Sequence, residues 1–325
     1  SVRVVGDKSM AVAQYLPHKN KKNIIPIALS TDNNYIFPTI VTITSILENA
    51  APLTYYDIYV LLSSDFNEES KYKLLKIKDH YQCCNITLIN MKNEFKDISV
   101  NKAVPGPAIS TPTYYRLKLA STLSHLNKIL YLDVDIIVLN DLLKLYKTNI
   151  ESYYVAGVVD LDTAIIRGNK YTNNIGIKDS SQYINAGVLL MNLEKIRNDE
   201  IEKKFEEFIN KNKNNKNWQW HDQDVINSVC YNMIYILPYK FNVMIHQFSK
   251  INVYKVLDKK NFYAGTLRKA FKSPEIIHYS GIKPWSIYAT RFSPIWWDYA
   301  KKSLSFDEIK HNYNIPYQVL KLLHK

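Results

Sequence analysis

The fold class is decided by the run Asn23-Ile24-Ile25-Pro26-Ile27-Ala28-Leu29 and the stretch Ser30-Thr31-Asp32-Asn33-Asn34 that follows it. A short apolar run that ends in polar residues predicts a buried strand with a loop at its carboxyl end. Further along, we expect a helix over 37–47, a strand over 57–62, a helix over 67–78 and a strand over 85–89. This alternation predicts an α/β fold in which helices cover a largely parallel sheet, with ligands bound at the carboxyl ends of its strands.

The composition excludes several classes of protein. With 46% hydrophobic residues and 8 glycines in 325 residues, the chain is neither globally disordered nor collagen-like. Three cysteines cannot form a disulfide framework, which indicates a cytoplasmic protein. No apolar run reaches the roughly 20 residues that span a bilayer. The formal net charge of +12 indicates an anionic partner, and nucleic acid, an anionic membrane and a phosphorylated substrate all fit.

The chain is expected to have three parts. Residues 1–22 form an N-terminal arm, residues 23–290 form one α/β domain, and residues 291–325 form a helical, aromatic and basic C-terminal extension. In this extension, Trp296 and Trp297 precede Lys301 and Lys302, a pattern that suits an anionic membrane surface. The alternative is a helix that packs on the domain and exposes a basic face.

The sharpest local feature is the apolar segment 131–139, which contains Asp133 and Asp135. In a continuous strand these two side chains point to the same side. Burying two like charges together is costly unless a cation neutralises them, and carboxylates at this spacing suit Mg²⁺ or Mn²⁺. The alternative is that one carboxylate caps a loop while the other is solvated.

Five further segments carry motifs in a fixed order around this one. They are Ser30-Thr31-Asp32-Asn33-Asn34-Tyr35, Thr113-Tyr114-Tyr115-Arg116-Leu117-Lys118-Leu119, Tyr183-Ile184-Asn185-Ala186-Gly187-Val188-Leu189-Leu190-Met191-Asn192-Leu193, His221-Asp222-Gln223-Asp224-Val225-Ile226-Asn227 and Ile277-His278-Tyr279-Ser280-Gly281-Ile282-Lys283-Pro284-Trp285. Together the six segments resemble the bacterial retaining glycosyltransferases of family 8, which include lipopolysaccharide galactosyl- and glucosyltransferases and glycogenin. The resemblance covers residues 25–285 and implies a GT-A-like, Rossmann-like mixed sheet flanked by helices.

The resemblance also implies a set of site residues. Asp133, Asp135 and His278 are the implied metal ligands, and an imidazole ligand favours Mn²⁺ over Mg²⁺. The implied donor is a UDP-sugar, with Asp32, Asn34 and Tyr35 at the uridine and Lys283 at the diphosphate. The implied donor-binding set is Ser30, Asp32, Asn34, Tyr35, Arg116, Asp133, Val134, Asn185, Ala186, Asp222, Gln223, Gly281 and Lys283.

Each of these assignments has a structural alternative. Asp32 and Asp222 could be helix N-caps, Arg116 a surface ion pair and Lys283 a solvated base. The chain also departs from the family pattern, because Ile282 alone stands between Gly281 and Lys283, where the family commonly has two residues. We therefore expect the loop at Gly281 to close differently.

The resemblance implies retention of anomeric configuration, and two residues are candidates for catalysis. Gln223 would lie near the anomeric carbon opposite the leaving diphosphate, and because an amide is a poor nucleophile, this placement favours front-face return. Asp224 is the candidate nucleophile if a covalent glycosyl intermediate forms.

The sequence thus predicts a metal-dependent hexosyltransferase that moves glucose or galactose from a UDP-sugar to a glycan. The acceptor is expected to be lipopolysaccharide, another cell-surface glycan or a lipid-linked glycan at the inner face of the cytoplasmic membrane. One alternative is a glycosyltransferase that modifies protein. Another is a nucleic-acid-binding protein, motivated by the net charge of +12 and interleaved Tyr and Lys; in the preferred interpretation nucleic acid is not a partner.

Overall fold

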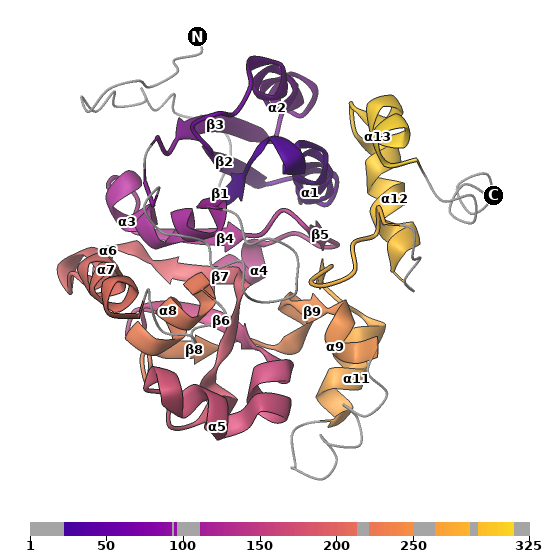
Figure 1. Ribbon diagram of the computed structural model, residues 1–325. Helices are drawn as coiled ribbons and strands as arrows, with labels where there is room; N and C mark the ends of the chain where they lie inside the picture. Colours follow the sequence, from indigo (N-terminus) through magenta and orange to yellow (C-terminus); the bar gives the residue numbers. More distant parts are fainter. Residues whose placement is uncertain are drawn as a thin grey trace.

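The protein is described by a computed structural model over residues 23–92, 94–95, 111–212, 221–249, 264–286 and 292–314. The predicted arm over 1–22 lies outside these ranges. In the described residues, seven strands form the main sheet (Figure 1). They are β1 (Asn23–Thr31), β2 (Thr54–Leu62), β3 (Cys84–Asn90), β4 (Lys128–Leu132), β6 (Val155–Val159), β7 (Ile184–Asn192) and β8 (Ile234–Ile236).

The main sheet is mixed, as predicted. Its strand order is β3-β2-β1-β4-β7-β6-β8. The first four strands in this order run parallel, and Ile27 of β1 lies between Ile58 of β2 and Leu130 of β4. β7 is antiparallel to both of its neighbours, so its amino end lies at the same edge as the carboxyl ends of β1 and β4. That edge gathers residues from distant parts of the chain.

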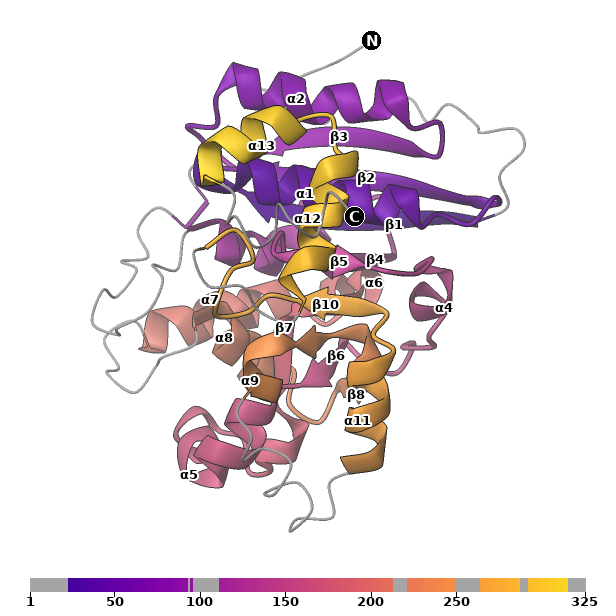
Figure 2. The ribbon, with the colours of Figure 1, turned by 90° about the vertical axis from the view of Figure 1, so that its right-hand side faces the viewer.

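Helices cover both faces of the sheet (Figures 1 and 2). One face packs against α1 and α2, and the other packs against α3 and α6 to α8. α2 begins where Asn67 accepts a hydrogen bond from Ser70 N at 2.8 Å, as expected of an N-cap. The helices are α1 (Ile36–Glu48), α2 (Glu68–His80), α3 (Leu119–Thr122), α4 (Leu143–Tyr146), α5 (Gly168–Thr172), α6 (Leu193–Asn198), α7 (Ile201–Asn212), α8 (His221–Val229), α9 (Ile245–Ser249), α11 (Ala264–Lys272), α12 (Ser293–Lys302) and α13 (Phe306–Tyr313).

A second, three-stranded sheet lies beside the first. It consists of β5 (Ile136–Val138), β10 (Ile276–His278) and β9 (Val243–Met244) in that order. The prediction of one continuous strand over 131–139 is therefore wrong, because the chain leaves the large sheet after Leu132 and enters the small one at Ile136. Partners distant in sequence set this break: Asp133 N donates to Gly187 O at 2.8 Å, and Tyr279 N donates to Asp135 O at 2.9 Å.

The C-terminal helices pack against the domain. Trp296 and Trp297 are fully buried in a cluster with Val41 of α1 and Ile277 of β10. Trp297 Nε1 also donates to Pro284 O at 3.0 Å. The two tryptophans of the aromatic and basic pattern therefore face the core, so a membrane contact would have to use the lysines or other residues. No helix in the described part of the chain is long and apolar enough to cross a bilayer.

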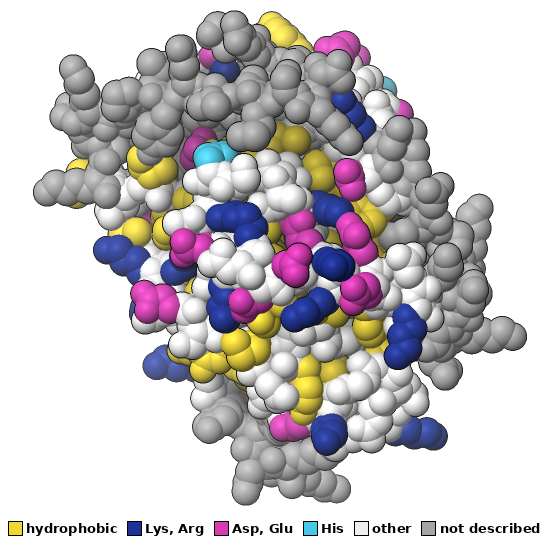
Figure 3. All heavy atoms as spheres, turned by 90° about the vertical axis from the view of Figure 1, so that its left-hand side faces the viewer, with side chains coloured by type: hydrophobic (Ala, Val, Ile, Leu, Met, Phe, Trp, Pro, Cys, Tyr) yellow, Lys and Arg dark blue, Asp and Glu magenta, His cyan; other side chains and the backbone are white. Residues whose placement is uncertain are grey.

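Charge on the described surface is balanced. Over the described ranges, Lys and Arg are about as numerous as Asp and Glu, so the excess behind the net charge of +12 belongs to the remaining segments. Figure 3 shows the face at the left of Figure 1, where basic side chains alternate with acidic ones. On α6, for example, Lys195 pairs with Asp199 at 3.0 Å. Among the described side chains of this face there is no continuous basic patch of the kind that nucleic acid requires.

Candidate metal and donor site

The predicted metal ligands meet between the two sheets. Asp133 follows β4, Asp135 precedes β5, and His278 ends β10. His278 Nε2 lies 3.2 Å from Asp135 Oδ1 and 3.8 Å from Asp133 Oδ2. One ligand atom from each of the three residues lies within 4.8 Å of the others. The break between β4 and β5 thus brings together the three groups that the sequence named.

The surroundings of these residues fit a bound cation. Two carboxylates and one imidazole form a donor set that suits Mn²⁺. Gly187 of β7 leaves room for them, because a Cβ at this position would lie 2.3 Å from His278 Cε1 and 2.8 Å from Asp133 Oδ2. The His278 and Asp133 side chains therefore occupy the space that a side chain at position 187 would fill, and their close approach requires glycine here.

Each metal-site carboxylate also contacts a basic side chain. Lys283 Nζ donates to Asp135 Oδ2, and Arg116 Nη2 donates to Asp133 Oδ1 at 2.8 Å. Burial alone would raise the pKa of Asp135, but Lys283 and His278 outweigh it and hold this pKa well below the usual range. Burial would likewise lower the pKa of Lys283, but Asp135 raises it. The basic side chains therefore share these carboxylates with any cation that binds.

Arg116 lies on a 3-10 helix (Thr111–Lys118) and is almost fully buried, which rules out the surface ion pair considered from sequence. Its Nε lies 3.0 Å from Asp222 Oδ2, and its guanidinium stacks 4.3 Å from the centre of the Tyr131 ring. One guanidinium thus pairs with two carboxylates, that of the buried Asp222 and that of the partly exposed Asp133. Burial raises the pKa of Asp222 to about 7. The Arg116 charge opposes this rise and the nearby Asp133 charge adds to it.

A cluster of side-chain amides lies next to this ion pair. Gln223 Oε1 accepts from Ala186 N at 3.0 Å and from Asn185 Nδ2 at 3.1 Å. Asn185 and Ala186 stand at the start of β7, and because β7 runs antiparallel to its neighbours they lie at the same edge as the carboxyl ends of β1 and β4. Gln223 Nε2 and Asn185 Nδ2 also face Asp160 Oδ2 at 3.4 and 3.5 Å. Asp160 was missed from sequence, although it directly follows the apolar run of β6 and so meets the same criterion as Asp32.

Asp224 occupies a different environment from Gln223. Its carboxylate is fully buried and accepts hydrogen bonds from Tyr171 OH and Tyr183 OH, both at 2.6 Å. Both oxygens therefore already have phenol donors. A carboxylate held in this way is suited to fixing α8 against its neighbours and is poorly placed to attack a sugar.

The first-strand residues have a structural role that the sequence also suggested. Asp32 Oδ1 accepts from Asn34 N at 2.9 Å and from Tyr35 N at 3.2 Å, so it caps the 3-10 helix Asn33–Tyr35. Asn34 is exposed, and the Tyr35 ring meets the Trp285 ring edge to face at 6.2 Å between centroids. Ser30 is buried near the carboxyl end of β1. All four lie at the edge of the sheet that carries the metal ligands.

The predicted phosphate loop lies against α9. Gly281 has φ +88°, a conformation that favours glycine, and a Cβ there would lie 3.1 Å from His246 Cβ. His246 Nδ1 lies 2.8 Å from Ser280 Oγ, and Lys283 Nζ donates to Tyr279 O at 3.0 Å. Val134, also predicted to bind the donor, has its carbonyl oxygen held by Thr42 Oγ1 at 3.0 Å.

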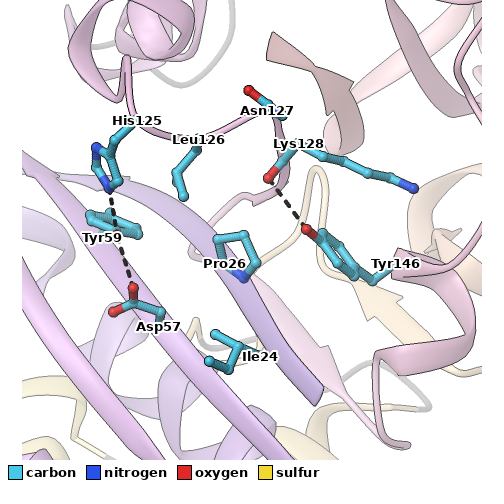
Figure 4. Close-up of a pocket in the computed structure, with 9 residues that line it drawn as sticks. All are labelled: Ile24, Pro26, Asp57, Tyr59, His125, Leu126, Asn127, Lys128 and Tyr146. Atoms are coloured by element: carbon cyan, nitrogen blue, oxygen red, sulfur yellow. Dashed lines mark hydrogen bonds between the residues drawn. The ribbon is translucent and has the colours of Figure 1, made fainter. Parts of the chain in front are cut away.

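A groove of about 290 Å³ lies toward the amino ends of β1 and β4, away from these residues (Figure 4). Its polar side chains already have partners within the protein. Tyr59 OH donates to Asp57 Oδ2 at 2.8 Å and lies 3.2 Å from His125 Nε2, and Lys128 Nζ donates to Thr148 O at 2.7 Å. None of the site residues predicted from sequence lines this groove.

The geometry can be set beside known proteins. A family model described as glycosyl transferase family 8 matches residues 26–289. The chain belongs to glycosyl transferase family 8. One relative of this family 8 chain is a putative glycosyltransferase of Haemophilus influenzae, 31% identical over 219 residues. The match covers 66% of this chain and 62% of the relative, so the chain spans less than two thirds of that protein.

Two other relatives of this family 8 glycosyltransferase are informative. A lipopolysaccharide 1,2-glucosyltransferase of Escherichia coli is 28% identical over 304 residues, which cover 92% of this chain and 82% of the relative. The crystal structure of the galactosyltransferase LgtC with donor and acceptor sugar analogues has a TM-score of 0.73 and 25% identity, covering 89% of this chain and all of LgtC. The predicted family and the predicted GT-A-like fold are both confirmed.

Proposed function

We propose that this family 8 glycosyltransferase moves a hexose, glucose or galactose, from a UDP-sugar to a glycan acceptor with retention of anomeric configuration and in a metal-dependent reaction. The observation that carries the proposal is the convergence of Asp133, Asp135 and His278 at the carboxyl edge of the sheet. This edge is where open α/β sheets bind their ligands. A transferase of this family with such a cluster is equipped to bind a nucleotide diphosphate through a cation.

Three proposed metal ligands, through the cation that they hold, and Lys283 would together neutralise the negative charge of the diphosphate. Asp133, Asp135 and His278 would hold Mn²⁺, with Mg²⁺ as the alternative. Such a cation supplies charge neutralisation for the diphosphate leaving group. Lys283, at hydrogen-bonding distance from Asp135, places a further positive charge beside the same position. Electrostatic stabilisation of this kind usually contributes more to catalysis than any other single effect.

The donor sugar is proposed to lie over the buried ion pair and the amide cluster. Arg116 and Asp222 would bind sugar hydroxyls, together with Asn185 and Ala186. Ser30, Asp32, Asn34 and Tyr35 would bind the uridine, while Val134 and Gly281 would let the backbone approach the nucleotide. These roles follow family motifs at positions that meet along one edge of the sheet.

Gln223 is proposed to face the anomeric carbon without becoming covalently bound to it. Its Oε1 is held by Ala186 N and Asn185 Nδ2, so the amide is oriented before the donor arrives. Asp224, the covalent alternative, is buried and saturated by two tyrosine hydroxyls. This arrangement supports front-face return, in which the acceptor hydroxyl enters on the side from which the diphosphate leaves.

The proposed acceptor is lipopolysaccharide or another cell-surface or lipid-linked glycan. Relatives named lipopolysaccharide 1,2-glucosyltransferase support this acceptor class, and LgtC has been crystallised with an acceptor sugar analogue. Such an acceptor places the enzyme in the cytoplasm at the inner face of the cytoplasmic membrane. A protein acceptor is the rival within the same chemistry.

The test is hydrolysis of UDP-glucose and UDP-galactose with and without Mn²⁺, followed by transfer to lipopolysaccharide and to protein. We expect Mn²⁺-dependent release of UDP that falls at least about 100-fold in Asp135→Asn. Asp57→Asn, in the groove toward the amino ends of the strands, is the matched control and should retain turnover. Equal turnover in the presence of EDTA would contradict the metal assignment, and sugar incorporated only into protein would contradict the glycan acceptor.

A further inference from the structure

A chain of side-chain amides connects His278 to Gln223 through Asn242, a residue that no motif singled out. Asn242 is fully buried and immediately precedes β9, which pairs in parallel with β10. Because His278 lies opposite Met244 in this pairing, Asn242 lies within reach of the imidazole. His278 Nδ1 is 2.9 Å from Asn242 Oδ1.

The orientation of each amide is decided by a backbone donor. Asn185 Oδ1 accepts from Gly187 N at 2.9 Å, and a backbone N–H can only donate. The atom of Asn242 that faces Asn185 Oδ1 at 2.9 Å must therefore be its Nδ2. It follows that Asn242 turns its Oδ1 to the imidazole, which makes His278 Nδ1 the donor of that hydrogen bond.

The same reasoning fixes the orientation of the Gln223 amide, at the other end of this series of side chains. Ala186 N donates to Gln223 Oε1, which also accepts from Asn185 Nδ2. Two backbone N–H groups of β7, those of Ala186 and Gly187, thus determine which way the oxygen and the NH2 group of each side-chain amide point, from Gln223 to Asn242 beside His278. His278 Nε2 faces both aspartates and lies 3.2 Å from Asp135 Oδ1, so a proton on Nε2 would pair with that carboxylate, whereas with the proton on Nδ1 the Nε2 lone pair is free for a cation.

We propose that Asn242 is a positioning residue that holds His278 in the Nδ1–H tautomer and so keeps its Nε2 lone pair directed at the cation site. The inference about the tautomer stands on the hydrogen bonds alone, whereas its meaning for metal affinity rests on the proposed function. Partners of a metal-bound histidine commonly change metal affinity by about 10- to 100-fold when they are removed.

The decisive experiment is nitrogen NMR of the protein labelled with ¹⁵N-histidine, free of metal and at an alkaline pH where imidazoles are neutral. The His278 signals are assigned by their loss in His278→Ala. We expect wild type to show the Nδ1–H tautomer, and Asn242→Asp to retain it because an acceptor remains. Asn242→Leu, which removes the acceptor, should shift His278 toward the Nε2–H tautomer.

The control is Asn49→Ala, which removes a side-chain amide that donates to Val138 O at 2.9 Å and does not belong to the series of amides between Gln223 and His278. It is expected to lower stability without changing the His278 tautomer. Metal affinity, measured by Mn²⁺ titration without nucleotide, should fall about 10-fold or more in Asn242→Leu. An unchanged tautomer in a folded Asn242→Leu protein would overturn the proposal.

The same measurements separate this inference from the proposed function. If the tautomer depends on Asn242 but Mn²⁺ binding is unaffected by His278→Ala, the metal site is wrong and the positioning role of Asn242 stands. If Mn²⁺ binding requires His278 while Asn242→Leu changes neither tautomer nor affinity, the metal site stands and the role of Asn242 is overturned.

Discussion

Lys283 donates a hydrogen bond to Asp135, one of the three residues placed to hold a cation. The ammonium and a metal ion therefore compete for the same carboxylate until a diphosphate offers Lys283 another partner. This relationship makes Lys283 unfavourable for binding the metal alone and favourable for binding metal and nucleotide together.

Replacing Lys283 by Met should have opposite effects on two measurements. Without nucleotide, Mn²⁺ should bind several-fold more tightly, because the competing charge is gone. With a UDP-sugar, kcat/KM should fall about 100-fold or more, because the charge at the diphosphate is lost. Mn²⁺ titration and steady-state kinetics test the two halves, and Lys195→Met on α6 is the control. Weaker binding of Mn²⁺ alone in Lys283→Met would show that the lysine is not a competitor.

Replacing Gly187 by Ala should disrupt the metal site from its backbone side. The added Cβ would lie 2.3 Å from His278 Cε1, so the imidazole must move. We expect Mn²⁺ affinity to drop sharply and unfolding stability to fall by about 1 to 3 kcal/mol. Gly157→Ala on β6 is the control. Its added Cβ would lie 2.6 Å from Ile184 Cδ1, so this variant should lose stability but keep its Mn²⁺ affinity. Equal Mn²⁺ affinity in Gly187→Ala and wild type would refute this placement of His278.

Asp222 should make the metal-free protein less stable as pH rises. Its pKa is raised to about 7 in the folded protein, against about 3.8 when unperturbed, so between these values the folded state binds more protons than the unfolded state. Its contribution to stability is therefore complete below about pH 4 and is lost by about pH 7. Urea denaturation with EDTA near pH 5 and pH 8 should show a fall of a few kcal/mol that is smaller in Asp222→Asn. An identical pH dependence in the two proteins would contradict the raised pKa.

Asp224 is expected to matter for stability more than for chemistry. Asp224→Asn removes the charge and replaces one carboxylate oxygen by an NH2 group that cannot accept, so one tyrosine hydroxyl loses its acceptor and unfolding stability should fall by roughly 1 to 3 kcal/mol. Turnover should fall by less than about 10-fold where the protein remains folded, since a nucleophile would cost far more. Mass spectrometry after incubation with donor should find no glycosyl adduct on this residue. An adduct on Asp224 would establish the covalent route instead.

Trp296 should behave as a core residue. Trp296→Ala removes a fully buried ring between α12 and α1 and should reduce unfolding stability by about 3 to 5 kcal/mol. Leu304→Ala, at a side chain that is 48% exposed, should have little effect. Binding to anionic vesicles should not change in a folded Trp296→Phe protein. Loss of vesicle binding in that variant would restore the tryptophan to a membrane role.

The sequence predicted what depends on local pattern. The strand that starts at Asn23 and the polar residues after it could be identified because apolar periodicity and strand ends are local properties. Asp133, Asp135 and His278 were named through ordered motifs, and the structure brings them together. The capping role that the sequence allowed for Asp32 is present, and its role at the uridine stays a prediction.

What escaped prediction depends on tertiary contacts. The segment 131–139 looks continuous, and its break is created by hydrogen bonds to Gly187 and Tyr279 from elsewhere in the chain. Asn242 has no local signal, because its importance comes from the pairing of β9 with β10. A helix with Trp296 and Trp297 fits a membrane surface and a protein core equally well by sequence, so only its packing shows which of these environments it occupies.

The division of the metal ligands between two sheets has a further consequence. Asp133 follows a strand of the large sheet, whereas Asp135 directly precedes β5 of the small sheet and His278 ends its strand β10. A cation held by all three would cross-link the sheets, and its binding free energy would add to the folded state. Metal should then slow hydrogen exchange in β9 and β10 and protect the C-terminal half from proteolysis. The supply of metal ion would set how long the folded enzyme survives as well as how fast it turns over.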